Sequence, residues 1–349
     1  MEKAIIITNG LLATDNAKTA HGLIRESRRF EIVGVVDHVD AGRDAGGVLD
    51  GKNRNIPVFK TITEALAVKP TTCIVGVATA GGVFPGDLIE QVKTAIQNKL
   101  SIVNGLHDHL NERPDIKNLA DENGVALTDI RIPKKRKDLH FWTGDIFKLK
   151  TPVIAVIGTD CALGKRTTTR FVMNACNNAG IHAEMIYTGQ TGWLQGGKYG
   201  FIFDSTLNDF VSGELEHAIL SCAEETKAEV ILIEGQSALR NPSGPCGSEM
   251  LVSGNAKSVI LVHAPKRKYY EHDAAWGEIH SVESEIELIR QFGSKVIAVA
   301  LNTEHCSDEE AFAFQKEYET RLSIPILLPL QEGVDKIVPQ IKKLIVSIK

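Results

Sequence analysis

The sequence predicts an α/β protein with two domains, each built around a parallel sheet. Short apolar runs alternate with amphipathic stretches along almost the whole chain, which is typical of βαβ units. The chain has 349 residues, more than one hydrophobic core usually spans. A segment of mixed polarity with a proline at each end interrupts the alternation. We therefore expect a first domain at 1–133, a connection at 134–150 and a second domain at 151–349.

The apolar runs place the strands of both expected sheets. In the first domain we expect strands at 3–8, 31–37, 72–78, 100–105 and 125–131, and helices near 20–28, 62–67, 85–98 and 116–123. In the second domain we expect strands at 152–158, 182–188, 229–235, 258–264, 295–302 and 324–329.

The composition excludes several classes of protein. A net charge of −5 argues against a general nucleic-acid binder, which usually carries a basic excess. No apolar stretch approaches the roughly 18 residues of a membrane span, and the first residues do not resemble a signal peptide. Six cysteines without a CxxC pair fit a reducing cytosol and argue against zinc. We expect a cytoplasmic homo-oligomer that binds neither nucleic acid nor membrane, with no resident metal.

The stretch GTDCALGKRTTT follows the expected strand 152–158 and precedes an amphipathic segment. Strand, glycine-bearing turn and helix in this order form the context of a phosphate-binding loop. The spacing departs from G-x-x-x-x-G-K-[ST], because five residues separate the two glycines and an arginine follows the lysine. We predict that a phosphate-bearing cofactor is bound by Gly158, Thr159, Asp160, Gly164, Lys165, Arg166, Thr167 and Thr168.

Two residues after later strands support a nucleotide-type site. The run EVILIEGQS places Glu234 at the end of a buried strand, where a Mg²⁺ partner is expected. A capping or ion-pair carboxylate is the alternative interpretation. Asn302 ends the run 295–302, where related folds read the nucleotide base, and we include it as a cofactor-binding candidate.

Candidates for catalysis are spread over both domains. No G-x-G-x-x-G fingerprint follows the first strand, so a dinucleotide site is not predicted there. His107, in VNGLHDHL, is a candidate general base, and Arg131, in DIRIP, is a candidate for binding carboxylates. The Gly- and Pro-rich loop GQSALRNPSGPCG adds Arg240 as a second carboxylate ligand and Cys246 as a possible nucleophile, although no histidine is near Cys246 in the sequence.

A basic cluster, Lys266 to Lys268, follows the expected strand 258–264. Its position suits an anionic ligand, and a solvated turn is the alternative.

The loop GTDCALGK resembles that of dethiobiotin synthetase and of cobyrinic-acid amidase relatives, and IEGQ resembles their strand-terminal Glu-Gly. Those relatives place threonine directly after the lysine. Here Arg166 takes that place and Thr167 follows, which puts the Mg²⁺ ligand in doubt. A guanidinium could instead neutralise phosphate charge.

A wider resemblance covers most of the chain. The stretches AKTAHGLIR, GVATAGG, NGLHDHL, DIRIP, GTDCALGKRTTT, TGQTGW, IEGQSAL and NPSG are similar to a bacterial and archaeal family known as a domain of unknown function. That family has a Rossmann-like N-terminal half and a P-loop C-terminal half. Members are assigned as D-glutamate N-acetyltransferases, so the resemblance implies transfer of an acetyl group from acetyl-CoA to an amino acid.

Three functions remain open at this point. The acetyltransferase would use the loop for the phosphates of the coenzyme, Glu234 or His107 as base, and Arg131 or Arg240 for substrate carboxylates. An ATP-dependent ligase or kinase similar to dethiobiotin synthetase would use the loop for Mg-ATP. A nucleotide-binding protein without enzymatic activity is the third, although LNTEH lacks the residues of a guanine-reading N-K-x-D motif.

Overall fold

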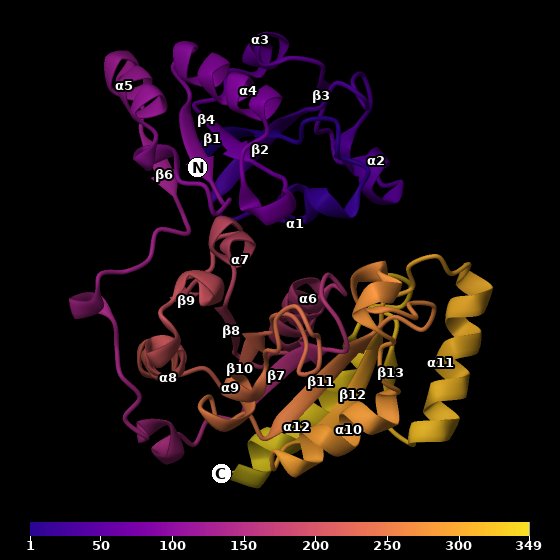
Figure 1. Cartoon of the computed structure of the whole chain (residues 1–349). Coiled ribbons are helices and arrows are strands. Elements are labelled where there is room, and N and C mark those ends of the chain that lie inside the picture. The colour runs from indigo at the N-terminus through magenta and orange to yellow at the C-terminus, as the bar shows by residue number, and fades with distance from the viewer. Residues whose placement is uncertain (349) are drawn as a thin grey trace. The chain divides into compact units, whose positions relative to one another are not determined.

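A computed structural model describes residues 1–348, and Lys349, the last residue of the expected second domain, lies outside them. The chain forms two compact units (Figure 1). The first comprises Met1–Pro133 and Gln190–Gly196, and the second Lys134–Gly189 and Gly197–Lys349. Each contains one sheet, and within the described residues the strands of both sheets pair in parallel, which confirms the expected fold class. Within residues 1–348, no helix combines the length and apolar content that a membrane crossing requires.

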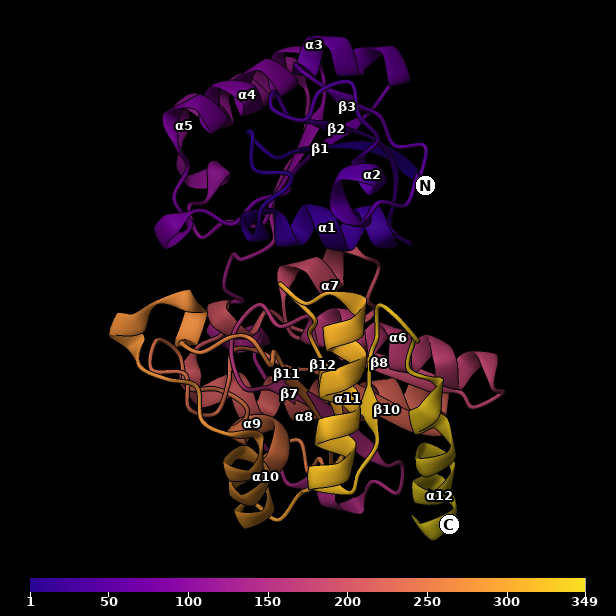
Figure 2. The same cartoon turned by 90° about the vertical axis from the view of Figure 1, so that its right-hand side faces the viewer.

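The first unit has a six-stranded sheet in the order β3-β2-β1-β4-β5-β6, the doubly wound order of Rossmann folds. Its strands are β1 (Glu2–Ile7), β2 (Phe30–Val36), β3 (Val58–Phe59), β4 (Thr72–Val75), β5 (Ser101–Asn104) and β6 (Leu127–Asp129). Its helices are α1 (Lys18–Arg25), α2 (Ala45–Asp50), α3 (Ile62–Ala65), α4 (Gly86–Gln97), α5 (Pro114–Asn123) and α7 (Gln190–Leu194). In Figure 2, α1 and α2 lie on one face of the sheet and α3, α4 and α5 on the other.

Helix α7 belongs to the first unit although its sequence lies inside the expected second domain. Leu194 is fully buried in the hydrophobic core of the first unit. The Nε2 of Gln195 donates to the carbonyls of Gly22, at 2.8 Å, and Glu26, at 3.0 Å, at the end of α1. The Arg29 guanidinium lies 4.0 Å from the ring centroid of Trp193. These contacts attach 190–196 to α1, which sequence spacing did not indicate.

The second unit has a seven-stranded sheet in the order β13-β12-β11-β7-β10-β8-β9. Its strands are β7 (Val153–Gly158), β8 (Ala183–Tyr187), β9 (Tyr199–Gly200), β10 (Val230–Glu234), β11 (Ser258–His263), β12 (Lys295–Leu301) and β13 (Ile326–Leu327). Its helices are α6 (Lys165–Asn178), α8 (Asn208–Thr226), α9 (Ser248–Val252), α10 (Val282–Gln291), α11 (Asp308–Leu322) and α12 (Val338–Ile348). In Figure 2, α6 and α12 lie on one side of this sheet and α9 and α10 on the other.

The expected connection 134–150 packs against α8 in the second unit. Two glutamates of α8, each 2% exposed, bind its backbone. Glu214 accepts from the backbone N–H of His140 at 2.8 Å, and Glu216 accepts from Thr143, at 2.6 Å, and Ile146, at 3.1 Å. A buried carboxylate needs such donors, and they fix the segment.

The carboxyl ends of β7, β8 and β10 meet at one edge of the second sheet, because neighbouring strands are parallel. The register pairs Glu234 with Val156, two residues before the end of β7. A Cβ on Gly235 would lie 2.1 Å from the Val156 carbonyl oxygen, so only glycine fits after Glu234. The sheet thus brings Glu234 beside the loop that begins at Gly158.

Candidate functional site

The loop between β7 and α6 has the geometry of a phosphate-binding turn. Ala162 and Gly164 have positive φ, at 52° and 86°, and α6 begins at Lys165. Such a turn directs backbone N–H groups to one side, and the start of the helix adds the positive end of its dipole. The Lys165 ammonium is 6% exposed and donates to the Asp160 carbonyl at 2.5 Å, which holds it across the loop. The loop can therefore hold a phosphate group.

Asp160 is completely buried, and its carboxylate is used within the protein. Its Oδ1 accepts from the Cys161 N–H, at 2.7 Å, and the Asn241 amide, at 2.9 Å. Its Oδ2 accepts from Arg267 Nη1, at 2.9 Å, and the Glu271 N–H, at 2.8 Å. A carboxylate accepts about four hydrogen bonds, so the side chain of Asp160 is saturated. Asp160 was predicted to bind the cofactor, but its carboxylate and its backbone carbonyl both form hydrogen bonds that shape the loop.

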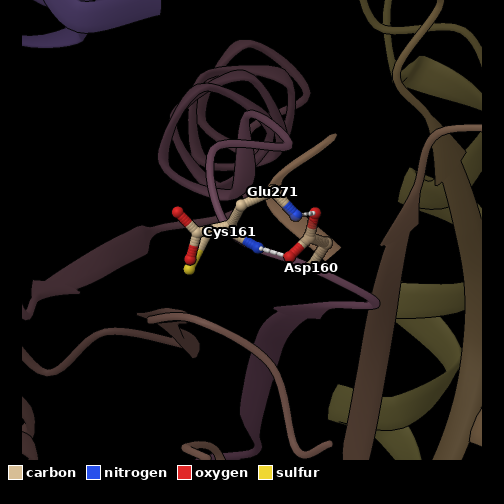
Figure 3. Close-up of side chains that lie close together, drawn as sticks. All are labelled: Asp160, Cys161 and Glu271. Atoms are coloured by element: carbon tan, nitrogen blue, oxygen red, sulfur yellow. Dashed lines mark hydrogen bonds between the residues drawn. The ribbon is translucent and has the colours of Figure 1, made fainter. Parts of the chain in front are cut away.

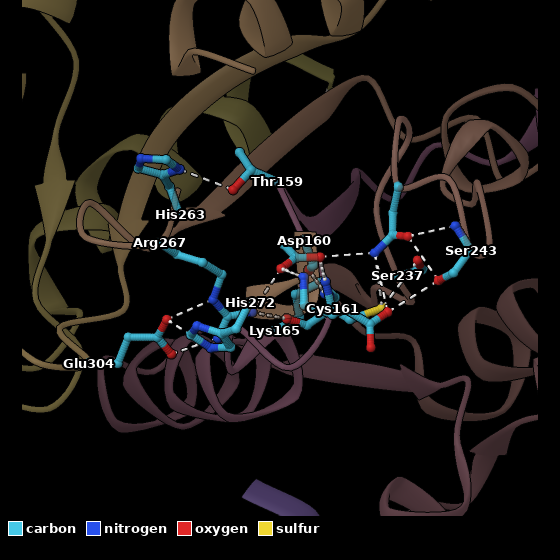
Figure 4. Close-up of polar contacts among 12 residues, drawn as sticks. Thr159, Asp160, Cys161, Lys165, Ser237, Ser243, His263, Arg267, His272 and Glu304 are labelled. Atoms are coloured by element: carbon cyan, nitrogen blue, oxygen red, sulfur yellow. Dashed lines mark hydrogen bonds and ion pairs between the residues drawn. The ribbon is translucent and has the colours of Figure 1, made fainter. Parts of the chain in front are cut away.

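Arg267 connects Asp160 to a second carboxylate (Figure 4). Its Nε and Nη2 each donate at 2.6 Å to Glu304, and its Nη1 also donates at 2.7 Å to the Cys161 carbonyl. The side chain is 2% exposed. The interpretation of residue 267 as part of a solvated turn or an anion site was wrong, because its guanidinium is buried between two carboxylates. Lys266 and Lys268, in contrast, are exposed.

Asp160, Cys161 and Glu271 lie close enough to be considered as a cation site (Figure 3). One ligand atom from each falls within 4.8 Å of the others. The saturated carboxylate of Asp160, with a guanidinium on Oδ2, leaves no lone pair for a metal. Burial raises the pKa of the Cys161 thiol, which disfavours the thiolate that a metal needs. We therefore assign this cluster to the architecture of the loop.

Thr159 is fixed from the other side of the loop by a buried histidine. Its Oγ1 is hydrogen-bonded to His263 Nδ1 at 3.0 Å, and His263 Nε2 is hydrogen-bonded to the Tyr318 hydroxyl at 3.1 Å. Burial, with a smaller effect of Arg321, lowers the pKa of His263 to about 4. The imidazole is thus neutral at physiological pH, and it orients the threonine through a fixed hydrogen bond.

Glu234 is 3% exposed at the end of β10. Burial raises its pKa from the ordinary 4.5 to about 6, against the opposing effects of Arg166, the Thr188 N–H, Arg170 and Lys165. A carboxylate with a pKa near working pH and cationic neighbours is typical of functional sites. Glu234 is thus the titratable group of the loop region whose properties fit acid–base chemistry.

Thr188 holds one carboxylate oxygen of Glu234, and Gln236 holds Thr188. Oε2 accepts from the Thr188 N–H at 3.3 Å, and the Gln236 amide donates to the Thr188 hydroxyl at 2.9 Å. A Cβ on Gly189 would lie 3.8 Å from Glu234 Oε1 and 2.9 Å from the Gln236 amide nitrogen. A side chain at position 189 would therefore crowd the Gln236 amide and would be in ordinary van der Waals contact with Oε1.

The other candidate residues of the second unit make their contacts with residues other than Glu234. Arg240 Nε donates to Glu285 at 2.7 Å, and its Nη2 donates to the Ser284 hydroxyl at 3.0 Å. Asn302 Oδ1 accepts from the Glu304 N–H at 2.9 Å, which forms a local turn. Cys246 is 6% exposed, and burial raises its pKa to about 12, so it is not a ready nucleophile. Thr167 is half-buried and Thr168 is buried on the first turn of α6.

His107 and Arg131 meet in the first unit, as two candidates from separate stretches. Arg131 Nη1 lies 3.1 Å from His107 Nε2, while Arg131 Nε donates to the Gly105 carbonyl at 2.6 Å and Nη2 to Gln190 Oε1 at 2.8 Å. His107 is exposed and Arg131 is 8% exposed. The structure holds this guanidinium in one orientation through contacts of Nε, Nη1 and Nη2.

Comparison with known families agrees with this arrangement. Residues 140–338 match the model described as domain of unknown function (DUF1611_C) P-loop domain, and residues 39–133 match domain of unknown function (DUF1611_N) Rossmann-like domain. The chain belongs to the DUF1611 family. The resemblance expected from the sequence is thereby confirmed.

Two curated relatives of this DUF1611 protein are named D-glutamate N-acetyltransferase. The one from Pseudoalteromonas sp is 30% identical over 289 residues, which cover 80% of this chain and 83% of the relative. The one from Tritonibacter scottomollicae is 28% identical over 284 residues, with the same coverage of 80% and 83%. The crystal structure of a DUF1611 family protein from Anabaena variabilis is similar with a TM-score of 0.90 at 26% identity, over 98% of this chain and 100% of that one.

Residues that the sequence did not single out complete the site of this DUF1611 chain. Thr188 and Gln236 orient Glu234, Arg170 adds a positive charge one turn into α6, and His263 fixes Thr159. Thr188 directly follows the end of β8 and Gln236 comes two residues after the end of β10, so their positions could have suggested them. Arg170 follows Arg166 by four residues, the spacing that places two side chains on one helix face.

Proposed function

We propose that this chain is an acetyl-CoA-dependent N-acetyltransferase acting on the amino group of an amino acid such as D-glutamate, in the cytoplasm. The names of the two relatives support acetyl transfer as the reaction class. The observation that carries the proposal is the buried Glu234, with its pKa raised to about 6, beside Lys165, Arg166 and Arg170. A proton acceptor thus lies beside cations that could bind a polyanion.

The positive charges at the start of α6 suit the phosphates of coenzyme A. This coenzyme carries a pyrophosphate and a 3′-phosphate, so a phosphate loop can hold it without breaking a phosphoanhydride bond. Acetyl-CoA supplies the acetyl group. Lys165 and the helix start would bind one phosphate, and Arg166 would neutralise charge that Mg²⁺ neutralises in P-loop NTPases. An arginine directly after the P-loop lysine is the feature that favours this ligand over Mg-ATP.

Glu234 is the proposed general base. Its Oε2 is held by the Thr188 N–H, so Oε1 would accept the proton of the amino group. A base is most effective when its pKa lies near the working pH, and about 6 meets that condition. His107 is the alternative base. Arg131 and Arg240 are the two candidates for the substrate carboxylates, and both already make side-chain hydrogen bonds.

Thermal unfolding with acetyl-CoA, Mg-ATP and Mg-GTP in parallel tests the ligand. A ligand at 100 times its dissociation constant stabilises by about 2.7 kcal/mol, which raises the midpoint by several degrees. We expect a shift with acetyl-CoA that Lys165→Ala abolishes and that Lys268→Ala, an exposed lysine paired with Glu278, leaves intact. Thiol release with D- and L-amino acids then tests transfer, and we expect Glu234→Gln to abolish it.

Two results would overturn the proposal. A shift with Mg-ATP alone would make the loop a nucleotide site and favour the ligase. Improved use of acetyl-CoA by Arg166→Thr would contradict the role given to the guanidinium.

A further inference from the structure

An apolar patch lies on the surface of the second unit, away from the phosphate loop in sequence and in its contacts. It consists of Phe141, Phe147, Leu207 and Val252, which are 68%, 62%, 46% and 54% exposed. They come from the segment before β7, the start of α8 and the end of α9, all visible in Figure 1. Large apolar side chains exposed together mark interaction surfaces more often than single ones do.

The two phenylalanines of the apolar patch contact other aromatic rings. The ring of Phe141 meets that of Phe210 edge to face at 6.0 Å, and the ring of Phe147 meets that of Trp142 in the same way at 5.6 Å. Trp142 Nε1 also donates to the Ser253 carbonyl at 3.2 Å, beside Val252. Phe141 and Phe147 thus each pack on a partly buried ring, that of Phe210 and that of Trp142.

The apolar patch is held on ordered backbone. Glu216 fixes Thr143 and Ile146 on either side of a turn, and Ile146 is 1% exposed. Phe141 and Phe147 flank this anchor and point away from the core, as their exposure shows. An interface whose aromatic groups are already ordered loses little conformational entropy on binding. The arrangement suits a preformed protein–protein contact.

The area of the apolar patch fits the core of a dimer interface. With about 200 Å² for each phenylalanine side chain, Phe141 and Phe147 alone expose about 250 Å². Leu207 and Val252 bring the total to roughly 400 Å², within the ~300–600 Å² of functional patches. A stable dimer buries about 800 Å² on each partner, somewhat more than half of it apolar. The patch supplies most of that apolar share.

Charges of both signs flank the apolar patch, which favours a second copy of the chain as the occupant. Lys135, Arg136 and Lys137 are exposed before it in the sequence, and Asp209 is exposed two residues after Leu207. A two-fold contact can set the basic residues of one copy against the acidic residue of the other. We infer that the apolar patch is the core of an isologous dimer interface.

Sedimentation velocity of the full chain between about 1 and 50 μM tests the inference. We expect a dimer, and we expect Phe141→Asp and Phe147→Asp each to weaken dimerisation by 30-fold or more, as for buried aromatic interface residues. The matched control is Phe312→Asp, at a phenylalanine of α11 that is 44% exposed and outside the patch, which should leave the dimer intact. Far-UV circular dichroism and thermal melts of the variants establish that they are folded.

A wild-type monomer at 50 μM would overturn the inference. A dimer that persists in both patch variants, or that Phe312→Asp dissociates as well, would overturn the location. If the wild type forms an assembly larger than a dimer, a two-fold decrease in the number of subunits in the patch variants, and not in the control, would support the inference. The readout is independent of acetyl transfer.

Discussion

Replacing Glu234 with glutamine should stabilise the fold at neutral pH while it abolishes turnover. The wild-type carboxyl is 3% exposed, and burial raises its pKa from 4.5 to about 6. A carboxyl whose pKa is raised in the folded state stabilises that state only while it is protonated. This contribution is complete below pH 4.5 and is lost as the pH rises through 6. Glutamine keeps the shape and an oxygen for the Thr188 N–H, without the charge.

The magnitude follows from the pKa difference. A rise from 4.5 to about 6 corresponds to about 2 kcal/mol, at about 1.4 kcal/mol for each pKa unit. For a unit of this size, about 2–4 °C accompanies each kcal/mol. We therefore expect the melting difference between Glu234→Gln and wild type to increase by about 4–8 °C between pH 4 and pH 8.

Calorimetry or fluorescence melts of both proteins at half-unit pH intervals measure this difference, without ligand. Glu309→Gln, at an exposed carboxylate of α11, is the control and should follow the wild type at every pH. A difference that stays flat, or that shrinks as the pH rises, would mean that the three cations stabilise an ionised Glu234. The reasoning that makes it a base near neutral pH would then be refuted.

Three further outcomes follow from the site. Asp160→Asn should lower the free energy of unfolding by about 3–5 kcal/mol in urea titrations, because it leaves the buried Arg267 with one counter-charge fewer; a loss below 1 kcal/mol would contradict the role of the pair. Gly189→Ala should lower kcat more than 10-fold, because its methyl meets the Gln236 amide at 2.9 Å. A second change, Gln236→Ala, should relieve this clash but should not restore the activity that depends on the amide. His263→Gln should make the melting temperature fall less steeply between pH 6.5 and pH 4. The pKa of His263 is lowered to about 4, so this histidine stabilises the fold above pH 6.5 and loses that contribution as the pH falls.

Much of the fold follows from local patterns in the sequence. Fully buried parallel strands need unbroken apolar runs, and every residue of β7 and β11 is buried, which is why those runs predicted them. Strands β3 and β9 have two residues each and leave no such run. Helix α7 was assigned to the second domain because its neighbours in sequence are there. Its contacts with α1 depend on residues about 170 positions away.

The site could be predicted from the sequence where a functional residue lies at the end of a strand. The loop at Gly158 and the position of Glu234 follow from this rule, since parallel strands place their carboxyl ends at one edge. Pairings across the chain have no such local signal. Nothing near Asp160 in the sequence indicates Arg267, 107 residues later, and nothing near Arg240 indicates Glu285. From the sequence alone, Asp160, Arg240 and Arg267 therefore resemble ligand-binding groups, and only the structure shows their partners.

The attachment of Gln190–Gly196 to the first unit bears on how the protein folds as it leaves the ribosome. The core of that unit includes Leu194, so Met1–Pro133 lacks one of its own buried residues when it first emerges. Synthesis at about 5–20 residues per second delays completion by several seconds, until β7, α6 and β8 have also been made. We expect the nascent N-terminal part to expose the surface of α1 during this interval. This order of assembly has two consequences. Chaperones can reach the N-terminal part at that stage, and a gene split at residue 133 should fail to yield a stable N-terminal fragment.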